Sequence, residues 1–341
     1  MDNPRIALML GDPAGIGPEL VARFLSKTDN WKGTTPIVVG DRRSLEAGSR
    51  VAGTATPALR VIDAPASSAT GFASLPRDGS PALLDFAPRD PALIPSGRVS
   101  VEAGAVTVDT LNYCIDLCLA GAVDGLVFAP LNKEAMMRAG LEFASELELF
   151  KARFPGHRAL EEINILDSIW TLRVTSHIPL RAVADQITSP RVLESIRFLA
   201  AAMAAHGEAR PRVAVAALNP HAGEHGLCGR EEIEQIEPAV RAARDEGIDA
   251  QGPFPADTVF LRLKSGEFNG LLSMYHDQGQ IATKLMGFSR GVTYHAGFAV
   301  PITTPAHGTA FDIAGQGRAD VSATACAYSI AARIAQSGRV S

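Results

Sequence analysis

The sequence predicts an α/β protein with a largely parallel sheet, and its length favours two domains. Short apolar runs alternate along the chain with longer helical segments, as they do when strands are joined by crossover helices. Polar residues, glycine or proline follow the apolar runs, as expected where parallel strands end at one edge of a sheet. A chain of 341 residues is long enough for one large core but favours two domains of ordinary size.

The first strand is predicted at residues 5–10 and leads into a glycine loop. A helix follows over 18–27, because Pro18 suits the first helical position and Glu19 suits the positive end of the helix dipole. Residues 51–98 are rich in Ala, Pro, Ser and Gly and predict short strands and loops. The other predicted strands are 35–41, 124–130, 171–177, 211–221 and 270–279, the last running into a turn; the other predicted helices are 101–123, 190–207 and 229–247.

The composition excludes several classes of protein. A hydrophobic content of 46% with 20% charged residues is typical of a globular chain, and a net charge of -5 argues against general nucleic-acid binding. The four cysteines do not form a disulfide framework, and Cys114 and Cys118 are expected to be small buried hydrophobic residues. Neither a signal peptide nor a membrane span is evident, so a cytoplasmic location is expected.

Three histidines, His177, His221 and His276, each lie just beyond a predicted strand. A single histidine at such a place usually makes structural hydrogen bonds, but three at equivalent positions converge on one edge of a sheet. Imidazole is the commonest ligand of divalent transition metals, and three protein ligands leave positions open for substrate. We therefore predict a metal site, with Asp257 or Asp277 as an oxygen ligand or as support for a histidine.

Two glycine-bearing loops lie almost a whole chain apart: "GDPAGIGPE" at 11–19 and "AHGTAFDIAGQGRAD" at 306–320. The first does not fit the dinucleotide fingerprint G-x-G-x-x-G. Gly15 and Gly17 are expected to let the backbone pass close to substrate or nicotinamide, at a helix start that attracts anions. Together the two loops resemble the paired nucleotide and substrate loops of the isocitrate and isopropylmalate dehydrogenases, which oxidise a hydroxy acid with a nicotinamide cofactor and then decarboxylate it.

Seven motifs in a fixed order narrow this resemblance: "GDPAGIGPE", "APLNKEA", "TSHIPLR", "NPHAGE", "GPFPADTVF", "MYHDQG" and "HGTAFDIAG". By these the chain resembles the 4-hydroxythreonine-4-phosphate dehydrogenase family of pyridoxine biosynthesis over residues 5–330. The resemblance implies two α/β/α domains with a cleft between them, a cofactor-side domain of 1–125 and 285–341, and a substrate, metal and dimerisation domain of 126–284.

The same resemblance implies a homodimer with shared active sites and a divalent metal at the three histidines. Zinc is expected, with Mg, Mn or Co as alternatives. His177 and His221 would act together, and His276 would come from the partner subunit.

In "HGTAFDIAG", His307, Gly308 and Thr309 are predicted to contact the cofactor. Asp312 is predicted to accept hydrogen bonds from the adenosine ribose and to repel a 2′-phosphate, which favours NAD over NADP. The alternative is that Asp312 merely caps the following helix.

The predicted substrate pocket departs from the family pattern. Glu146 and Leu147 replace a His-Thr pair, Thr293 replaces an asparagine, and Ile302 replaces an arginine that would clamp phosphate; Lys284 is kept. Arg290 or His295 could compensate. Terephthalate dihydrodiol dehydrogenases, which oxidise a non-phosphorylated cyclic diol carboxylate, share this apolar position and provide an alternative function.

The resemblance implies oxidation of a hydroxy acid to a β-keto acid that loses CO2, with the cation as Lewis acid at both steps. Lys133, Lys284 and Asp257 are the candidates for proton transfer, and Asp277 belongs to the predicted substrate pocket. A further alternative is a binding protein that has lost its chemistry on this scaffold.

Overall fold

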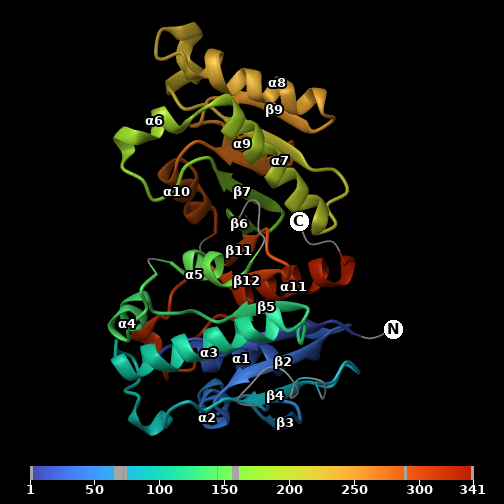
Figure 1. Ribbon diagram of the computed structural model, residues 1–341, viewed down its shortest axis with the longest axis vertical. Coiled ribbons are helices and arrows are strands. Elements are labelled where there is room, and N and C mark those ends of the chain that lie inside the picture. The colour runs from blue at the N-terminus through green and yellow to red at the C-terminus, as the bar shows by residue number, and fades with distance from the viewer. Residues whose placement is uncertain are drawn as a thin grey trace. The chain divides into compact units, whose positions relative to one another are not determined.

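The computed structural model describes residues 3–64, 72, 75–143, 145–155, 161–287 and 290–338 (Figure 1). The described chain divides into two compact units. The first contains the described residues up to 160 together with those from 292 onwards, and the second contains those from 161 to 291. The first unit thus includes the described residues of 126–155, which were predicted to belong with the substrate and metal residues.

The first unit is built on a sheet whose order is β3-β4-β2-β1-β5-β12-β11. Its neighbouring strands are parallel except for β11 and β12, where Tyr294 lies opposite Thr303. The strands are β1 (Arg5–Met9), β2 (Thr35–Gly40), β3 (Arg60–Asp63), β4 (Ala82–Asp85), β5 (Gly125–Phe128), β11 (Val292–Ala296) and β12 (Ile302–Pro305). The helices are α1 (Gly17–Leu25), α2 (Arg42–Ala52), α3 (Val101–Leu119), α4 (Lys133–Arg138), α5 (Glu146–Arg153) and α11 (Ser322–Ser337), with 3₁₀ turns at Thr28–Trp31, Pro91–Leu93 and Phe311–Ile313.

Burial explains why β1 is apolar from Ile6 to Met9, after Arg5 at its start. All five of its residues are buried, and it pairs in parallel with β2 on one side and with β5 on the other. A strand that is covered on both faces has no solvent side for polar residues. This central position fixes the loop that follows β1, which begins at Gly11 and carries the first glycine motif.

The second unit has the sheet order β6-β7-β10-β8-β9. β6 and β7 are antiparallel, and the other neighbouring strands are parallel. The strands are β6 (Glu161–Leu166), β7 (Ile169–Arg173), β8 (Arg212–Ala216), β9 (Asp249–Phe254) and β10 (Gly270–Ser273). The helices are α6 (Val183–Gln186), α7 (Ser189–Ala205), α8 (Glu237–Asp245), α9 (Val259–Lys264) and α10 (His276–Gly287), with 3₁₀ turns at Leu180–Ala182 and Pro220–Gly226 (η5) and a π-helical turn at Glu232–Ile236 (η6).

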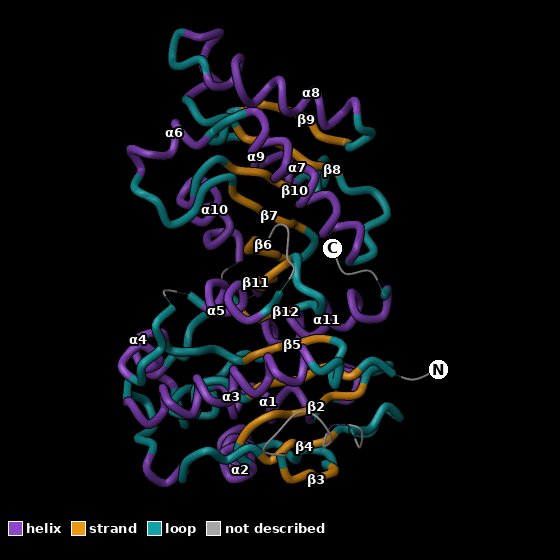
Figure 2. The backbone as a smooth tube through the Cα atoms, viewed as in Figure 1, coloured by secondary structure: helices purple, strands orange, loops and turns teal. Residues whose placement is uncertain are grey.

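The prediction of an α/β protein with a largely parallel sheet is confirmed, and Figure 2 shows strands and helices alternating along both units. Several local predictions differ: residues 211–221 form a strand only to Ala216, and β6, β9, β11 and β12 were not predicted. Residues 270–279 form a strand only to Ser273, and α10 begins at His276. Residues 229–247 form a π-helical turn before α8 rather than one helix.

Two predictions about individual regions agree with the structure. Cys114 and Cys118 are buried without a disulfide, and burial raises the pKa of the Cys118 thiol to about 12, so these thiols are unreactive. Among the described helices, none has the length and apolar character required to cross a membrane.

Candidate functional site

The loop after β1 is held by its glycines against neighbouring backbone. A Cβ at Gly17 would lie 2.0 Å from the Leu10 carbonyl oxygen, and a Cβ at Gly11 would lie 2.8 Å from the Pro130 carbonyl oxygen. The amide of Asp12 donates to that Pro130 oxygen at 3.0 Å. Only glycine allows such close approach, so the residues after β1 and after β5 form one rigid surface.

The two distant glycine motifs meet in this unit. The amide of Ile16 donates to the Thr309 carbonyl oxygen at 3.1 Å, and a Cβ at Gly15 would lie 2.9 Å from that oxygen. Farther along α1, Oε1 of the buried Glu19 accepts a hydrogen bond from the Ala319 amide at 2.9 Å. The close approach at Gly15 is to the loop that carries Asp312, and the approach of Gly15 and Gly17 to substrate or nicotinamide stays a prediction.

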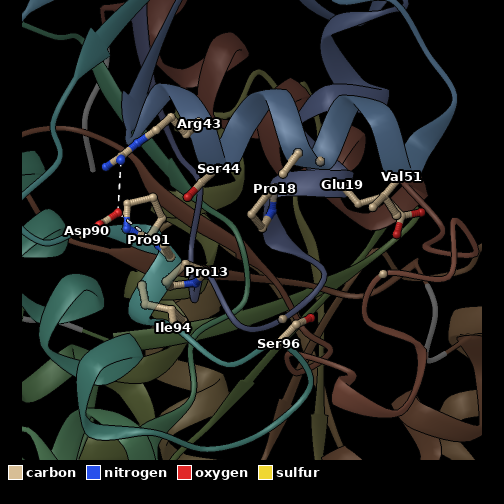
Figure 3. A pocket seen from close by; sticks show the side chains of 15 residues that line it. Pro13, Pro18, Glu19, Arg43, Ser44, Val51, Asp90, Pro91, Ile94 and Ser96 are labelled. Carbon is tan, nitrogen blue, oxygen red and sulfur yellow. Dashed lines mark hydrogen bonds and ion pairs between the residues drawn. The ribbon is translucent and has the colours of Figure 1, made fainter.

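Beside these loops lies a pocket of ≈ 390 Å³ between α1, α2 and the loop around residue 94. Figure 3 shows Arg43 and Asp90 at one end, joined by an ion pair of 3.0 Å, and Glu19 beside Val51 at the other. Of the predicted cofactor residues, all of which are described, Gly15 alone lines it. The pocket therefore adjoins the paired loops but does not contain Asp312.

Asp12 is a buried charge that the sequence analysis did not single out. Its side chain has no exposed surface, Oδ1 accepts a hydrogen bond from the Ala14 amide at 2.8 Å, and Oδ2 is buried without a partner among the described residues. Burial raises the pKa of this carboxyl from 3.8 to about 6, although the Ala14 amide partly opposes the rise. The carboxylate is therefore destabilised at neutral pH.

This burial predicts that Asp12→Asn stabilises the protein at pH 7. A folded pKa above the unfolded value means that the folded state binds more protons between about pH 4 and 6, so stability falls as pH rises through that window. The difference from 3.8 to about 6 corresponds to about 3 kcal/mol at pH 7. Denaturant unfolding from pH 4 to 7 should show that the variant loses this slope and is more stable at pH 7. Asp90→Asn, at an exposed carboxylate, is the matched control. An unchanged pH slope in Asp12→Asn would contradict this account.

The remaining residues of the cofactor prediction lie around the short 3₁₀ turn Phe311–Ile313. Asp312 is exposed, and its carbonyl oxygen accepts a hydrogen bond from Gln316 Nε2 at 2.7 Å. The alternative that Asp312 caps the next helix is not supported, because Asp320 accepts the hydrogen bond from the Ser322 amide at the start of α11. His307 is partly exposed, with Nδ1 3.1 Å from the Gly308 carbonyl oxygen, and a Cβ added at Gly308 would meet no atom within 4 Å.

In the second unit, His177 and His276 lie close together. Their ring centroids are 5.6 Å apart, and both line a pocket of ≈ 260 Å³ together with Ser176, Tyr275 and Asp277 among others. Asp277 Oδ1 lies 2.7 Å from Nδ1 of His276. A carboxylate on Nδ1 favours the tautomer that leaves the Nε2 lone pair free, which is the usual arrangement of a metal-binding histidine.

His221 and His177 share an unusual backbone. His221 has φ 53° and His177 has φ 36°, both in the left-handed region that non-glycine residues rarely adopt. Each such residue costs roughly 1–2 kcal/mol, and strain of this kind clusters at functional sites. Among the described residues of one chain, no group of three His, Cys, Asp or Glu side chains is arranged to hold a metal ion. Within one chain, therefore, His276 is the predicted ligand near His177, whereas the family resemblance pairs His177 with His221.

The candidates for proton transfer are exposed. Asp257 lies between β9 and α9, and Lys284 lies two turns along α10 from His276. Lys133 begins α4 in the other unit, and its Nζ lies 3.5 Å from Oε2 of Glu146, whose side chain is 15% exposed. The negative charge of Glu146 is thus partly offset by Lys133.

The other predicted pocket residues lie mostly inside the first unit. Ile302 has no exposed surface and belongs to the hydrophobic core, Thr293 on β11 is buried, and Leu147 packs against the same core. Isoleucine at 302 therefore fills core volume rather than an accessible surface of this chain.

The two residues considered as replacements for the phosphate clamp are also engaged. Arg290 makes two hydrogen bonds of 3.0 Å to the carboxylate of Asp167. His295 is buried against the rings of Phe128 and Phe150. Neither side chain is presented as a free phosphate-binding group.

Comparison with known proteins gives a consistent result. The family model "Pyridoxal phosphate biosynthetic protein PdxA" matches residues 32–331. The chain is 45% identical over 333 residues, 97% of each chain, to a Pseudomonas aeruginosa protein provisionally named 4-hydroxythreonine-4-phosphate dehydrogenase 2. It is 36% identical over 330 residues to the D-threonate 4-phosphate dehydrogenase of Pectobacterium atrosepticum, covering 97% of this chain and 99% of the relative.

Solved structures of dehydrogenases are also similar to this chain. The crystal structure of 4-hydroxythreonine-4-phosphate dehydrogenase from Klebsiella pneumoniae has a TM-score of 0.79 at 36% identity, covering 98% of both chains. A terephthalate 1,2-cis-dihydrodiol dehydrogenase from Burkholderia xenovorans has a TM-score of 0.64 at 26% identity, covering 94% of this chain and 95% of the other.

The α/β fold and the paired loops, together with these relatives, place the chain in the class of dehydrogenases that act on CH–OH groups. The chain belongs to the PdxA family, as the ordered motifs predict.

Proposed function

We propose that this protein is an NAD- and divalent-metal-dependent dehydrogenase of a four-carbon, 4-phosphorylated hydroxy acid, and that its β-keto product decarboxylates. The observation that carries the proposal is the contact between the two glycine loops, where Ile16 donates to Thr309. It supports a single site built from the two ends of the chain. The names of the quoted relatives support a phosphorylated hydroxy-acid substrate.

The donor set fits a divalent cation. His177 and His276 are neighbouring imidazoles, and Asp277 on Nδ1 of His276 frees Nε2 for a ligand bond. We propose that His177, His221 and His276 hold the cation, which would supply Lewis-acid stabilisation of oxygen charge in oxidation and decarboxylation. Zinc is the expected ion, because imidazole nitrogens suit it.

The protein's own side chains would bind and orient the substrate. Lys284 and Lys133 are exposed ammonium groups that attract carboxylate or phosphate oxygens, and Asp257 is an exposed carboxylate that can accept a proton. Because Lys133 pairs with Glu146, the repulsion between Glu146 and a phosphate is reduced. This pairing is compatible with a phosphorylated substrate, which the names of the relatives favour over the non-phosphorylated diol.

A second copy of the chain would complete the metal site. Ile178 and Leu180 are exposed beside His177, and Ile281 and Leu285 are exposed on α10, which begins at His276. Apolar side chains that gather at two of the predicted ligands favour burial by a partner. This supports the homodimer with shared sites.

The choice of coenzyme depends on Asp312. Its exposed carboxylate can accept hydrogen bonds from ribose hydroxyls and would repel a 2′-phosphate. NADP should therefore give a kcat/KM at least about 100-fold below that of NAD, which corresponds to about 3 kcal/mol. A comparable kcat/KM with both coenzymes would show that Asp312 does not select NAD over NADP.

The proposed substrate is tested by measuring NADH formation with a panel of candidate compounds. The proposal expects turnover of 4-phosphorylated hydroxythreonine or threonate and little turnover of their dephosphorylated forms or of a terephthalate-type cis-dihydrodiol carboxylate. Turnover of the diol alone would replace the proposed substrate with the alternative. Lack of turnover of every compound, in protein that binds the cation, would favour a non-catalytic role.

A further inference from the structure

The turn that carries His221 is left-handed over five consecutive residues. From His221 to His225, φ lies between 44° and 78°, and only Gly223 among the five is a glycine. Side chains with a Cβ avoid this conformation, so the turn requires contacts that hold it in place. These contacts come from the segment that follows it in sequence.

Glu232 makes the contacts at the start of the turn. Its side chain is 3% exposed, and Oε1 accepts hydrogen bonds from the amides of Leu218 at 2.9 Å and Asn219 at 2.7 Å. Oε2 accepts a third hydrogen bond from Asn219 Nδ2 at 3.0 Å. One carboxylate therefore fixes two of the three residues that connect the end of β8 to the turn.

Further contacts hold the turn itself, one of them to the same Glu232 carboxylate. A Cβ at Gly223 would lie 2.6 Å from Glu232 Oε2, so the turn packs directly on Glu232. The Cys228 amide donates to the Gly223 carbonyl oxygen at 3.0 Å, and Glu231 Oε2 accepts from Asn219 Nδ2 at 2.7 Å.

Glu232 itself begins the π-helical turn η6, a rare form that is frequent at functional sites. Among the described residues it makes no ion pair, and its carboxylate accepts hydrogen bonds from N–H groups of Leu218 and Asn219, which lead into the turn. Its burial therefore serves the turn rather than a surface charge pair.

We propose that Glu232 is a positioning residue for His221. By fixing Leu218 and Asn219, it holds the left-handed turn and so presents the His221 imidazole at the end of β8. This inference rests on the proposed function, in which His221 is a metal ligand. Glu232 acts through the backbone, because it hydrogen-bonds Leu218 and Asn219 rather than the His221 imidazole.

The test measures cation binding as well as stability. Co²⁺ is titrated by calorimetry into wild-type protein, Glu232→Ala, Glu232→Gln and His221→Ala, the Co²⁺ visible absorption spectrum is recorded, and denaturant unfolding is measured for each. Glu232→Ala should lower Co²⁺ affinity about 10–100-fold and change the spectrum. Glu232→Gln should show a smaller loss, because its amide can replace only one of the two carboxylate oxygens as acceptor.

Glu234→Ala is the matched control, because Glu234 lies in the same π-helical turn, is exposed and pairs with Arg230. It should bind Co²⁺ as the wild type does. If Glu232→Ala does not fold, Glu232→Gln decides by the same criteria.

Wild-type affinity and spectrum in the Glu232 variants, with binding lost in His221→Ala, would overturn the inference alone. Failure of the wild-type protein to bind Co²⁺, or full binding by His221→Ala, would contradict the proposed metal site and the inference with it.

Discussion

Replacing His221 by alanine should lower kcat/KM with NAD and the phosphorylated hydroxy acid by at least about 10³-fold. That factor corresponds to about 4 kcal/mol of transition-state stabilisation, a reasonable loss for one ligand of a Lewis-acid site. His221 lies in a strained turn that is held independently of its side chain, so the fold should survive the change. Steady-state kinetics with added Zn²⁺, together with circular dichroism, measure both effects.

His225 provides the control for this variant. It lies in the same left-handed turn, is exposed, and falls outside the family motif. His225→Ala should keep activity within a few-fold of the wild type. Equal activity in His221→Ala and His225→Ala would contradict the assignment of His221 as a metal ligand.

Replacing Gly17 by alanine should destabilise the first unit by about 3 kcal/mol or more. The new Cβ would lie 2.0 Å from the Leu10 carbonyl oxygen and 3.3 Å from the Ala129 Cβ. Leu10 directly follows β1, which is held between β2 and β5, so the backbone oxygen has little freedom to move away. The free energy of unfolding in urea measures the effect.

Gly308→Ala is the control for stability, because no atom lies within 4 Å of its added Cβ. It should unfold at nearly the wild-type denaturant concentration. A Gly17→Ala protein as stable as Gly308→Ala would show that the loop after β1 is not rigidly packed against its neighbours.

Much of the fold could be predicted because burial imposes a simple pattern on the sequence. β1 and β2 are buried throughout and therefore read as short apolar runs. β6 and β11 were not predicted, because both have polar residues in their sequences and pair with antiparallel neighbours. α10 was mistaken for the end of a strand, because its first residues, "HDQG", are polar and contain glycine.

The candidate site could be predicted where the residue type itself indicates the function, as histidine does for metal binding. The histidines and the two glycine loops stood out in the sequence, and the structure brings the loops together and places His177 near His276. Asp12 and Glu232 were missed as candidate functional residues, because their importance lies in burial and hydrogen bonding. For Asp12, its place between Gly11 and Pro13 directly after a buried strand was a usable signal.

Oxidation and decarboxylation are proposed to occur at one cation-dependent site. The most direct test of this proposal measures NADH and CO2 together from a 4-phosphorylated four-carbon hydroxy acid, before and after treatment with a chelator and again after Zn²⁺ is restored. We expect equal molar yields of NADH and CO2, loss of both with the chelator and recovery of both with Zn²⁺. Undiminished formation of both products in chelator-treated, metal-free protein would contradict it.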